Sequence, residues 1–207
     1  AVQQRILRRE PTSGDGHKVP LPPQHQLGEN KSRPSASHLR AGHIAQPLAH
    51  LGALLGFQVT VIDDRPEFAT QERFPSAEKV IRADFSDPFR DTPLHTRSHV
   101  LLVTRGHKYD YACLIRALQM DPPPAYIGMI GSRRRVRATY VQLLEEGIAH
   151  ALLDRIYAPV GLDVGAETPE EIAVAVAAEL IMVRRGGTGA SLKGVERIVE
   201  RFFKEDK

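Results

Sequence analysis

The stretch Ala125-Tyr126-Ile127-Gly128-Met129-Ile130-Gly131-Ser132-Arg133-Arg134-Arg135 decides how the rest of the chain is interpreted. Its first half is a short apolar run with Tyr and Ile, which is typical of a buried strand, and Gly131 ends it. Ser132 is suited to cap the helix that follows, because helix formers with regularly spaced apolar residues run from Arg133 to Glu146. The sequence therefore predicts a strand that passes directly into a helix.

This junction has the composition of an anion site. The first amides of a helix have no acceptor within the helix, and the helix dipole makes the same end electropositive. A glycine that permits close approach, a hydroxyl and a run of arginines suit a phosphate or another anion. A solvated basic first turn, in which Ser132 only caps the helix, explains the same residues. Both interpretations stay open for this stretch taken alone.

Strands and helices alternate along most of the chain. Strands are expected at 57–62, 79–84, 99–104 and 125–130. Helices are expected in a segment that opens at 41–45 and runs to Leu55, from Asp110, at 133–146 and at 169–184. Thr168 and Glu171 form a capping box around Pro169, and Gly186-Gly187 ends that helix. This alternation predicts an α/β fold, a Rossmann-like three-layer domain with a mostly parallel sheet.

The composition divides the chain into three parts. Residues 1–37 are rich in Pro, Gly, Ser and charge, and they predict an irregular or mobile N-terminal arm. The stretch 35–39 lacks the apolar run of a buried strand. Residues 38–190 form the predicted Rossmann-like domain, and residues 191–207 a charged C-terminal helix or tail.

Several classes of protein are disfavoured by composition. The formal charge is only +3 and aromatic residues make up 6% with no Trp, so a nucleic-acid groove is not expected, although the sequence pI is about 9.1. Cys113 is the single cysteine, which excludes a disulfide framework and a four-cysteine zinc site; a buried inert thiol is favoured over a reactive one. No apolar run approaches a membrane span, so we expect a soluble, cytoplasmic protein.

Polar residues follow three of these strands, and another group follows the segment before Gly42, which would be the first strand; such strand ends are where parallel sheets bind ligands. They are Gly42 and His43; Asp63, Asp64 and Arg65; Thr104, Arg105, Gly106 and His107; and Gly131, Ser132 and Arg133. His43 and His107 have the chemistry to titrate, to bind metal or only to donate hydrogen bonds. Of the two adjacent aspartates, one is free to bind ligand while the other caps or pairs with Arg65. No catalytic triad or metal-ligand spacing is present in the sequence.

The first of these turns has the order of a dinucleotide-binding unit: a glycine turn, a helix, a strand and an acid about twenty residues on. Gly42 and Ala45 fit the pattern G-x-G-x-x-G/A, whereas Arg40 occupies the place of its first glycine. An NAD(P)-dependent oxidoreductase that uses Asp63 is therefore one alternative. A βαβ turn that binds no nucleotide is another, and a protein-interaction module a third.

Five segments, in this order, resemble the C-terminal Rossmann-like domain of the XdhC/CoxI family, the xanthine dehydrogenase accessory proteins. They are AGHIAQPLA, GFQVTVIDDRPEFA with RFP downstream, VTRGHKYD, YIGMIGSRRR and PVGLDVGAETPEEIAVAVAAELI, and they cover about Leu39 to Arg184. The resemblance implies a chaperone that binds molybdenum cofactor (molybdopterin) and helps to insert it into a molybdenum hydroxylase, rather than an enzyme. By position it adds Gly161, Leu162 and Asp163 to the cofactor-binding residues given above.

The same resemblance implies partners. They are a molybdenum hydroxylase such as xanthine dehydrogenase, a cofactor-modifying enzyme and a second copy of the chain. Family members usually carry Gly-Ala-Gly-His after an apolar strand and an N-terminal domain with a cysteine-bearing segment. Here Arg40 stands at the first glycine, and residues 1–37 do not contain that domain's pattern.

Overall fold

The computed structural model describes residues 35–39, 42–84, 87–103 and 107–195, with backbone alone for 35–39, 107–110, 194 and 195. All of them lie within residues 33–207, one of two units into which the chain divides. Six strands form a single parallel sheet in the order β3-β2-β1-β4-β5-β6. The strands are β1 (Ser35–Leu39), β2 (Gln58–Asp63), β3 (Lys79–Arg82), β4 (Ser98–Leu102), β5 (Tyr126–Met129) and β6 (Ile156–Tyr157). The predicted α/β fold is confirmed, and this strand order is that of a Rossmann domain.

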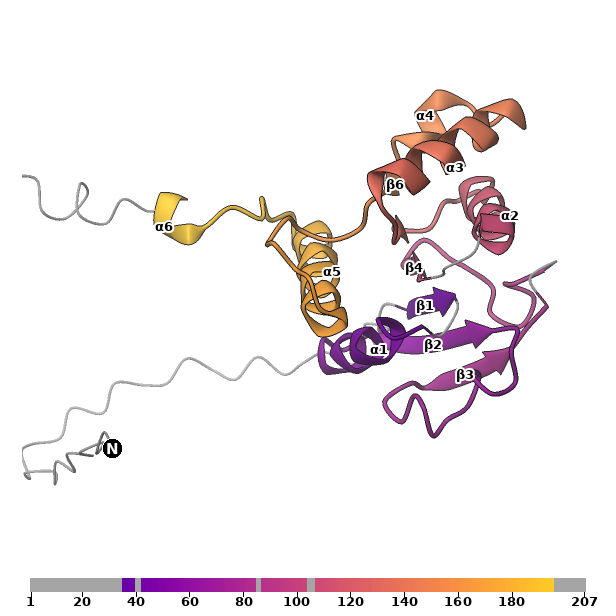
Figure 1. Cartoon of the computed structure of the whole chain (residues 1–207), viewed down its shortest axis with the longest axis horizontal. Coiled ribbons are helices and arrows are strands. Elements are labelled where there is room, and N and C mark those ends of the chain that lie inside the picture. Colours follow the sequence, from indigo (N-terminus) through magenta and orange to yellow (C-terminus); the bar gives the residue numbers. More distant parts are fainter. Residues whose placement is uncertain (1–34, 40–41, 85–86, 104–106, 196–207) are drawn as a thin grey trace, which may run out of the picture. The chain divides into compact units, whose positions relative to one another are not determined.

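Helices cover both faces of the sheet (Figure 1). They are α1 (Ala45–Leu54), α2 (His107–Leu118), α3 (Arg133–Glu145), α4 (His150–Leu153), α5 (Pro169–Arg185) and the short α6 (Leu192–Val195). Helices α1 and α5 pack against each other on one face. Helices α2, α3 and α4 lie on the other, together with the crossover 83–97 that leads from β3 to β4.

The central strands divide their side chains between two cores. In β4 and the residue after it, Val100 and Leu102 join the core under α2 and α3, whereas Leu101 and Val103 join the core under α1 and α5. Every residue of β4 is buried. Successive side chains of a strand point to opposite faces, so a continuous apolar run is what a strand covered on both sides requires. The sequence of β4 meets this requirement, which is why a strand is expected at 99–104 from the sequence.

Strand β1 corrects the expected N-terminal boundary. It begins at Ser35, so the division between residues 37 and 38 falls inside a strand, and the stretch 35–39 is a strand despite its lack of an apolar run. It lies in the middle of the sheet, where Leu39 is in register with Ile62 of β2 and Leu102 of β4. Backbone pairing on both sides holds this segment in the sheet without an apolar side-chain pattern. Residues 1–34 lie outside the described part of the chain.

Two other elements differ from prediction. Strand β6 was not predicted, because two residues are too few to produce a periodic pattern. Helix α2 begins at His107, three residues before the expected Asp110. Most of the expected C-terminal helix, at 196–207, falls among the residues that are not described.

The predicted caps are confirmed. Ser132 is extended and its hydroxyl accepts a hydrogen bond from the Arg135 amide at 3.3 Å. Thr168 and Glu171 form the capping box of α5, with Pro169 at the first helical position. Gly186 ends α5 in the left-handed conformation with φ of 70°. Cys113 is buried, as expected.

A buried polar contact joins β5 to α5. The Tyr126 hydroxyl donates to the carboxylate of Glu179, and both side chains are buried. The ring of Tyr126 lies between His99 and Tyr157, with centroid distances of 6.0 and 4.6 Å. Gly128 leaves space for this ring, because a Cβ there would lie 2.7 Å from a Tyr126 ring carbon. Burial, with the neighbouring carboxylate, raises the pKa of Tyr126 far above its usual value.

Candidate functional site

The carboxyl ends of the parallel strands bring most of the predicted site residues to one edge of the sheet. The loops there stay paired beyond the strands: the Ile130 amide donates to the Leu102 carbonyl at 2.9 Å, and the Val160 amide to the Met129 carbonyl at 3.1 Å. Gly42 lies beside the end of β4, since a Cβ built on it would be 3.7 Å from the Val103 carbonyl oxygen. The strand order reverses between β1 and β4, and ligands bind at such switch points.

Four of the predicted groups are described at this edge. Gly42 and His43 follow β1; Asp63, Asp64 and Arg65 end β2; Gly131, Ser132 and Arg133 follow β5; and Gly161, Leu162 and Asp163 follow β6. Thr104, Arg105 and Gly106 lie outside the described residues, and His107 is described only as the backbone start of α2.

Helix α3 starts at this edge with an unusual charge pattern. Its first three residues are Arg133, Arg134 and Arg135, and its first turn contains no acidic residue. Cations at a helix N-terminus oppose the helix dipole, by about 0.3–1 kcal/mol each when exposed. Arg133 and Arg134 are exposed. The first turn of α3 is therefore electropositive both from its side chains and from its backbone.

Helix α5 shows the arrangement that favours helix stability. Its first turn carries Glu170 and Glu171, and the Glu171 carboxylate accepts from the amides of Glu167 and Thr168 at 2.8 and 2.9 Å. These hydrogen bonds lower the pKa of Glu171. The same chain thus neutralises the start of α5 and leaves the start of α3 positive. This contrast marks α3 as the helix start that is suited to a bound anion.

Helix α1 also begins at the ligand edge without a neutralising group. No side chain caps it, and no acidic residue lies in its first turn. The Ala45 amide donates to the Gly42 carbonyl at 3.0 Å. Gly42 does not have a positive φ, and its Cβ direction meets the protein only at ordinary contact distance. The fold itself does not require glycine at position 42, which leaves close approach of a ligand as a reason for it.

Arg65 forms an ion pair with the carboxylate of Asp63. Asp63 is fully buried, and it accepts hydrogen bonds from the Arg65 amide, Nε and Nη2 at 3.0, 2.9 and 3.0 Å. The hydrogen bond to Asp63 raises the pKa of Arg65. Asp64 is half-buried, and of the two adjacent aspartates Asp63 is the one that pairs with Arg65. In this conformation Asp63 orients Arg65 rather than facing a ligand.

The aromatic ring of Phe68 extends this arrangement, which sequence reasoning missed. The guanidinium carbons of Arg65 and Arg73 lie 3.6 and 4.7 Å from the centroid of the Phe68 ring. Stacking on an aromatic face fixes the plane of a guanidinium. The signal was present as Phe68 three residues after Arg65, but only the fold brings Arg73 to the same ring. Arg134 was also omitted from the predicted set, although its position in α3 matches that of Arg133.

The residues that follow β6, Gly161, Leu162 and Asp163, lie at the ligand edge, and the first two also contact α5. Gly161 has φ of 105°, and a Cβ there would lie 3.3 Å from the Val176 amide nitrogen of α5. The Leu162 amide donates to the Ala175 carbonyl at 3.2 Å, whereas Asp163 is exposed. Gly161 is therefore required by its backbone conformation and by its contact with α5.

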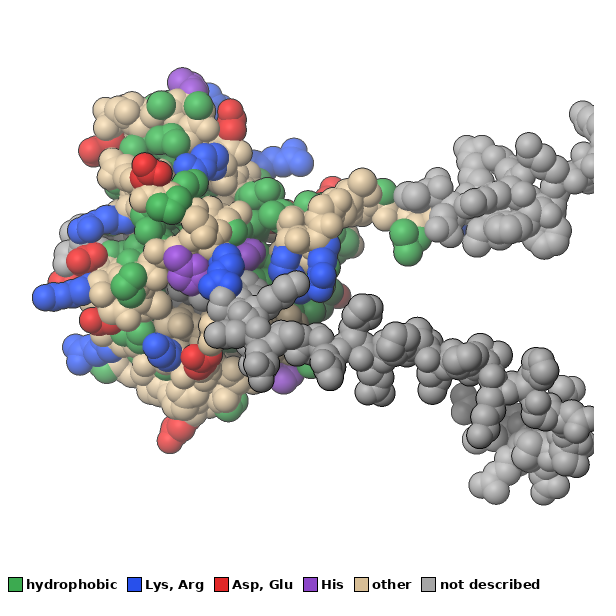
Figure 2. Space-filling view, turned by 180° about the vertical axis from the view of Figure 1, so that it is seen from behind, with side chains coloured by type: hydrophobic (Ala, Val, Ile, Leu, Met, Phe, Trp, Pro, Cys, Tyr) green, Lys and Arg blue, Asp and Glu red, His purple; other side chains and the backbone are tan. Residues whose placement is uncertain are grey.

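The described part of the chain contains no group of three His, Cys, Asp or Glu side chains arranged to hold a metal ion. Among the helices that are described, none has the length and apolarity to cross a membrane. Figure 2 shows one face of the molecule, where basic side chains are interspersed with acidic and apolar ones.

Comparison with known proteins identifies relatives of this fold. Residues 39–180 match the family described as the XdhC Rossmann domain. The chain is 34% identical over 158 residues to YqeB of Escherichia coli K12, a protein described as uncharacterized, covering 76% of this chain and 28% of YqeB. It is 36% identical over 148 residues to a Bacillus subtilis 168 protein described as a probable subunit of xanthine dehydrogenase, covering 70% of this chain and 41% of that protein.

A solved structure shows the same fold. A Bacillus halodurans crystal structure described as a xanthine dehydrogenase superposes with a TM-score of 0.64 at 29% identity, covering 79% of this chain and 46% of that one. The chain therefore spans less than half the length of each of these three relatives.

Proposed function

Because the chain belongs to the XdhC Rossmann-domain family, we propose that it binds molybdenum cofactor and assists its insertion into xanthine dehydrogenase or a related molybdenum hydroxylase. Support from relatives comes from the B. subtilis and B. halodurans proteins, whose descriptions name xanthine dehydrogenase. In this proposal the cofactor is cargo and the chain is a chaperone, so no catalytic residue is assigned.

The observation that carries the proposal is the positive start of α3. Three arginines stand where the helix dipole disfavours cations, whereas α5 in the same chain begins with two glutamates. A bound phosphate would reverse the sign of this interaction, since its charge attracts both the arginines and the first amides of the helix. The cofactor supplies a phosphate and a polar pterin.

The remaining residues of the edge suit the polar pterin. Gly42 leaves the start of α1 open to close approach, and Asp63 holds Arg65 in a fixed plane against Phe68. A guanidinium held in this way donates hydrogen bonds in a defined direction. We assign the phosphate to Gly131, Ser132 and Arg133, and the pterin to Gly42, Asp64 and Arg65.

Equilibrium binding of purified molybdenum cofactor tests the proposal. The chain should bind it saturably, and a Ser132→Ala/Arg133→Ala double variant should bind it at least about tenfold more weakly, because a charge-assisted contact is lost. An Arg82→Ala variant serves as the control, because Arg82 is an exposed arginine on the edge strand β3. Equal affinity in the double variant and the control would remove the phosphate site at α3.

One observation favours a second function, the binding of NAD(P) by an oxidoreductase. The strand order is that of dinucleotide-binding domains, and Asp63 ends β2, where such domains place an acid for the ribose. The three hydrogen bonds from Arg65 to Asp63 weigh against it, because a ribose would have to displace them. Titration with NAD and with NADP distinguishes the two functions, and no saturable signal with either would eliminate the second.

A further inference from the structure

A cavity of about 340 Å³, here called the α1 cavity, lies between helix α1 and the loop that connects β2 to β3. Its lining residues come from the first two turns of α1 and from this loop: Gln46, Pro47, Ala49, His50, Arg73, Phe74, Pro75 and Ser76. Pockets of this size hold small organic molecules.

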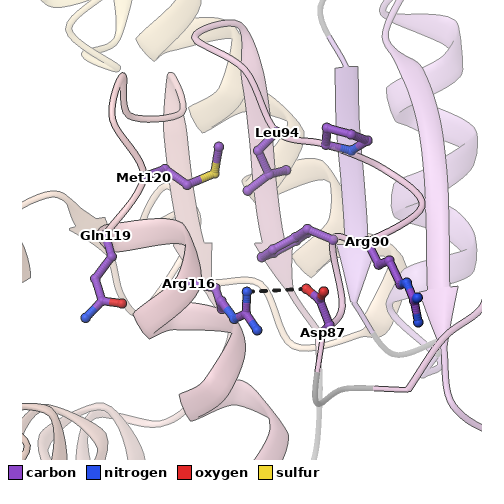
Figure 3. A pocket seen from close by; sticks show the side chains of 8 residues that line it. Asp87, Arg90, Leu94, Arg116, Gln119 and Met120 are labelled. Atoms are coloured by element: carbon purple, nitrogen blue, oxygen red, sulfur yellow. Dashed lines mark ion pairs between the residues drawn. The ribbon is translucent and has the colours of Figure 1, made fainter.

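The α1 cavity has a simple balance of charge. Arg73 lines it, and no acidic side chain is among the described residues that do so. His50 is neutral or positive in either protonation state, so it does not offset Arg73. By contrast, a cavity of about 470 Å³ between the crossover 83–97 and the end of α2 contains Asp87, whose Oδ1 lies 3.5 Å from Arg116 Nη1 (Figure 3).

The walls of the α1 cavity are held in place by the core and by two glutamines. Phe74 is a buried member of the core under α1 and α5. Gln71 Nε2 donates to the carbonyls of Phe74 and Ala77 at 3.1 and 2.9 Å, which fixes the turn of the loop. Gln46 Nε2 donates to the Arg73 carbonyl at 3.2 Å and ties the loop to α1. The cavity is therefore formed before a ligand binds, which lowers the cost of ordering it.

The guanidinium of Arg73 has no hydrogen-bond acceptor among the described residues. Its Nε is also shielded from solvent, so that donor is unsatisfied. The guanidinium carbon lies 4.7 Å from the centroid of the Phe68 ring. A buried donor without an acceptor is costly, and native structures rarely leave one without a reason.

The neighbouring arginine shows what is missing. Arg65 stacks on the same Phe68 ring at 3.6 Å, and its Nε and Nη2 donate to the Asp63 carboxylate at 2.9 and 3.0 Å. A guanidinium presents these two donors in a fork that matches the two oxygens of a carboxylate. Of the two arginines on this ring, Arg65 has a carboxylate partner and Arg73 has none among the described residues.

We propose that the α1 cavity binds a small organic monocarboxylate with an apolar body. The carboxylate has at Arg73 the place that Asp63 has at Arg65, and the apolar body lies against the proline and phenylalanine side chains of the walls. One guanidinium balances one negative charge. Because no hydrogen bond holds it, the Arg73 guanidinium is able to turn on the Phe68 ring and to present Nε with one Nη to the ligand. The proposal does not depend on the proposed function.

Histidine ring resonances provide a local test. His50 lines the cavity, with its Nδ1 3.0 Å from Ser76 Oγ, whereas His43 lies at the ligand edge and His150 in α4 on the other face of the sheet. We would label the histidine rings with ¹³C, assign the His50 signal with a His50→Gln variant, and titrate the full chain at constant pH with benzoate.

Two further probes separate charge from shape. The neutral amide benzamide should bind at least about tenfold more weakly than benzoate, because it lacks the charge that meets Arg73. Inorganic phosphate should also bind more weakly, because it leaves the apolar walls exposed to water. A saturable shift of the His50 signal with benzoate, and no shift of the His43 or His150 signal, is the expected result.

Two arginine variants locate the charge. Arg73→Gln should weaken benzoate about tenfold, whereas Arg82→Gln, which changes an exposed arginine of β3 outside the cavity, should bind as the unmodified chain does. An unchanged His150 resonance verifies that each variant is folded, and the comparison of benzoate with benzamide needs no variant. The proposal is overturned if His50 shows no saturable shift, if His43 responds in its place, if benzamide or phosphate binds as tightly as benzoate, or if the two arginine variants bind alike.

Discussion

Replacing Arg133 by glutamate should stabilise the isolated protein and abolish its binding of anions. Arg133 is the first residue of α3, is exposed, and has no acidic neighbour in its turn. The change removes one unfavourable interaction with the helix dipole and adds a favourable one, each of about 0.3–1 kcal/mol. The sum of roughly 0.6–2 kcal/mol corresponds to a rise in Tm of roughly 1–8 °C for a chain of this length.

Thermal denaturation at low salt and at 1 M NaCl measures this effect. The gain in Tm should be largest at low salt and should shrink at 1 M, because the interaction is screened. Arg133→Gln and Arg137→Gln form a matched pair of variants. Each removes the repulsion between Arg133 and Arg137, which lie four residues apart, but only Arg133 lies in the first turn of α3, so the difference between the two variants reports the interaction with the helix dipole. If Arg133→Gln stabilises the protein no more than Arg137→Gln does at low salt, Arg133 does not destabilise the start of α3, and the argument that this arginine is kept there to bind an anion is refuted.

Three further predictions concern the fold around the site. Tyr126→Phe should destabilise by about 1–3 kcal/mol, because buried Glu179 loses its donor. The pKa of Tyr126 is raised in the folded state above the unfolded value of about 10. The stability that its protonated hydroxyl contributes is therefore complete below about pH 10 and is lost as the pH rises above it. In Tyr126→Phe the free energy of unfolding should accordingly fall less steeply with alkaline pH, by the slope of one proton. Gly161→Ala should destabilise by at least about 1 kcal/mol because of its φ of 105°, whereas Gly42→Ala should leave Tm nearly unchanged and weaken cofactor binding; denaturation and binding assays separate the two glycines. Glu171→Gln should lower stability at pH 7, and the loss should shrink as the pH falls: the lowered pKa of Glu171 gives stability that is fully present above about pH 4.5 and is lost as the pH falls through the folded value, which denaturation over a series of acidic pH values checks.

Local signals were sufficient to predict most of the fold. The buried run at β4, the Ser132 cap and the Thr168–Glu171 capping box each depend on residues close in sequence, and each is confirmed. Strand β1 was not predictable in this way, because its place in the sheet comes from pairing with β2 and β4 rather than from its own composition. Strand β6 is held by β5 in the same manner.

The alternation of strands and helices was sufficient to predict that the candidate site lies at the carboxyl ends of the strands. The contacts of the individual side chains at this edge could not be predicted from it. Asp63 had the position of a ligand-binding acid in the sequence, and only the structure shows its three hydrogen bonds from Arg65. Gly42 and Gly161 looked alike as loop glycines, yet a positive φ and the contact with α5 distinguish the second. The stacking of Arg73 on Phe68 depends on how residues 65–74 turn, which their sequence alone does not specify.

The most direct measurement of the central claim is a crystal structure of the chain with molybdopterin bound. The account predicts that the phosphate accepts hydrogen bonds from the first amides of α3 and lies within reach of Arg133 and Arg134, with the pterin between Gly42 and Arg65. A phosphate bound elsewhere, with the first turn of α3 left open to solvent, would contradict it.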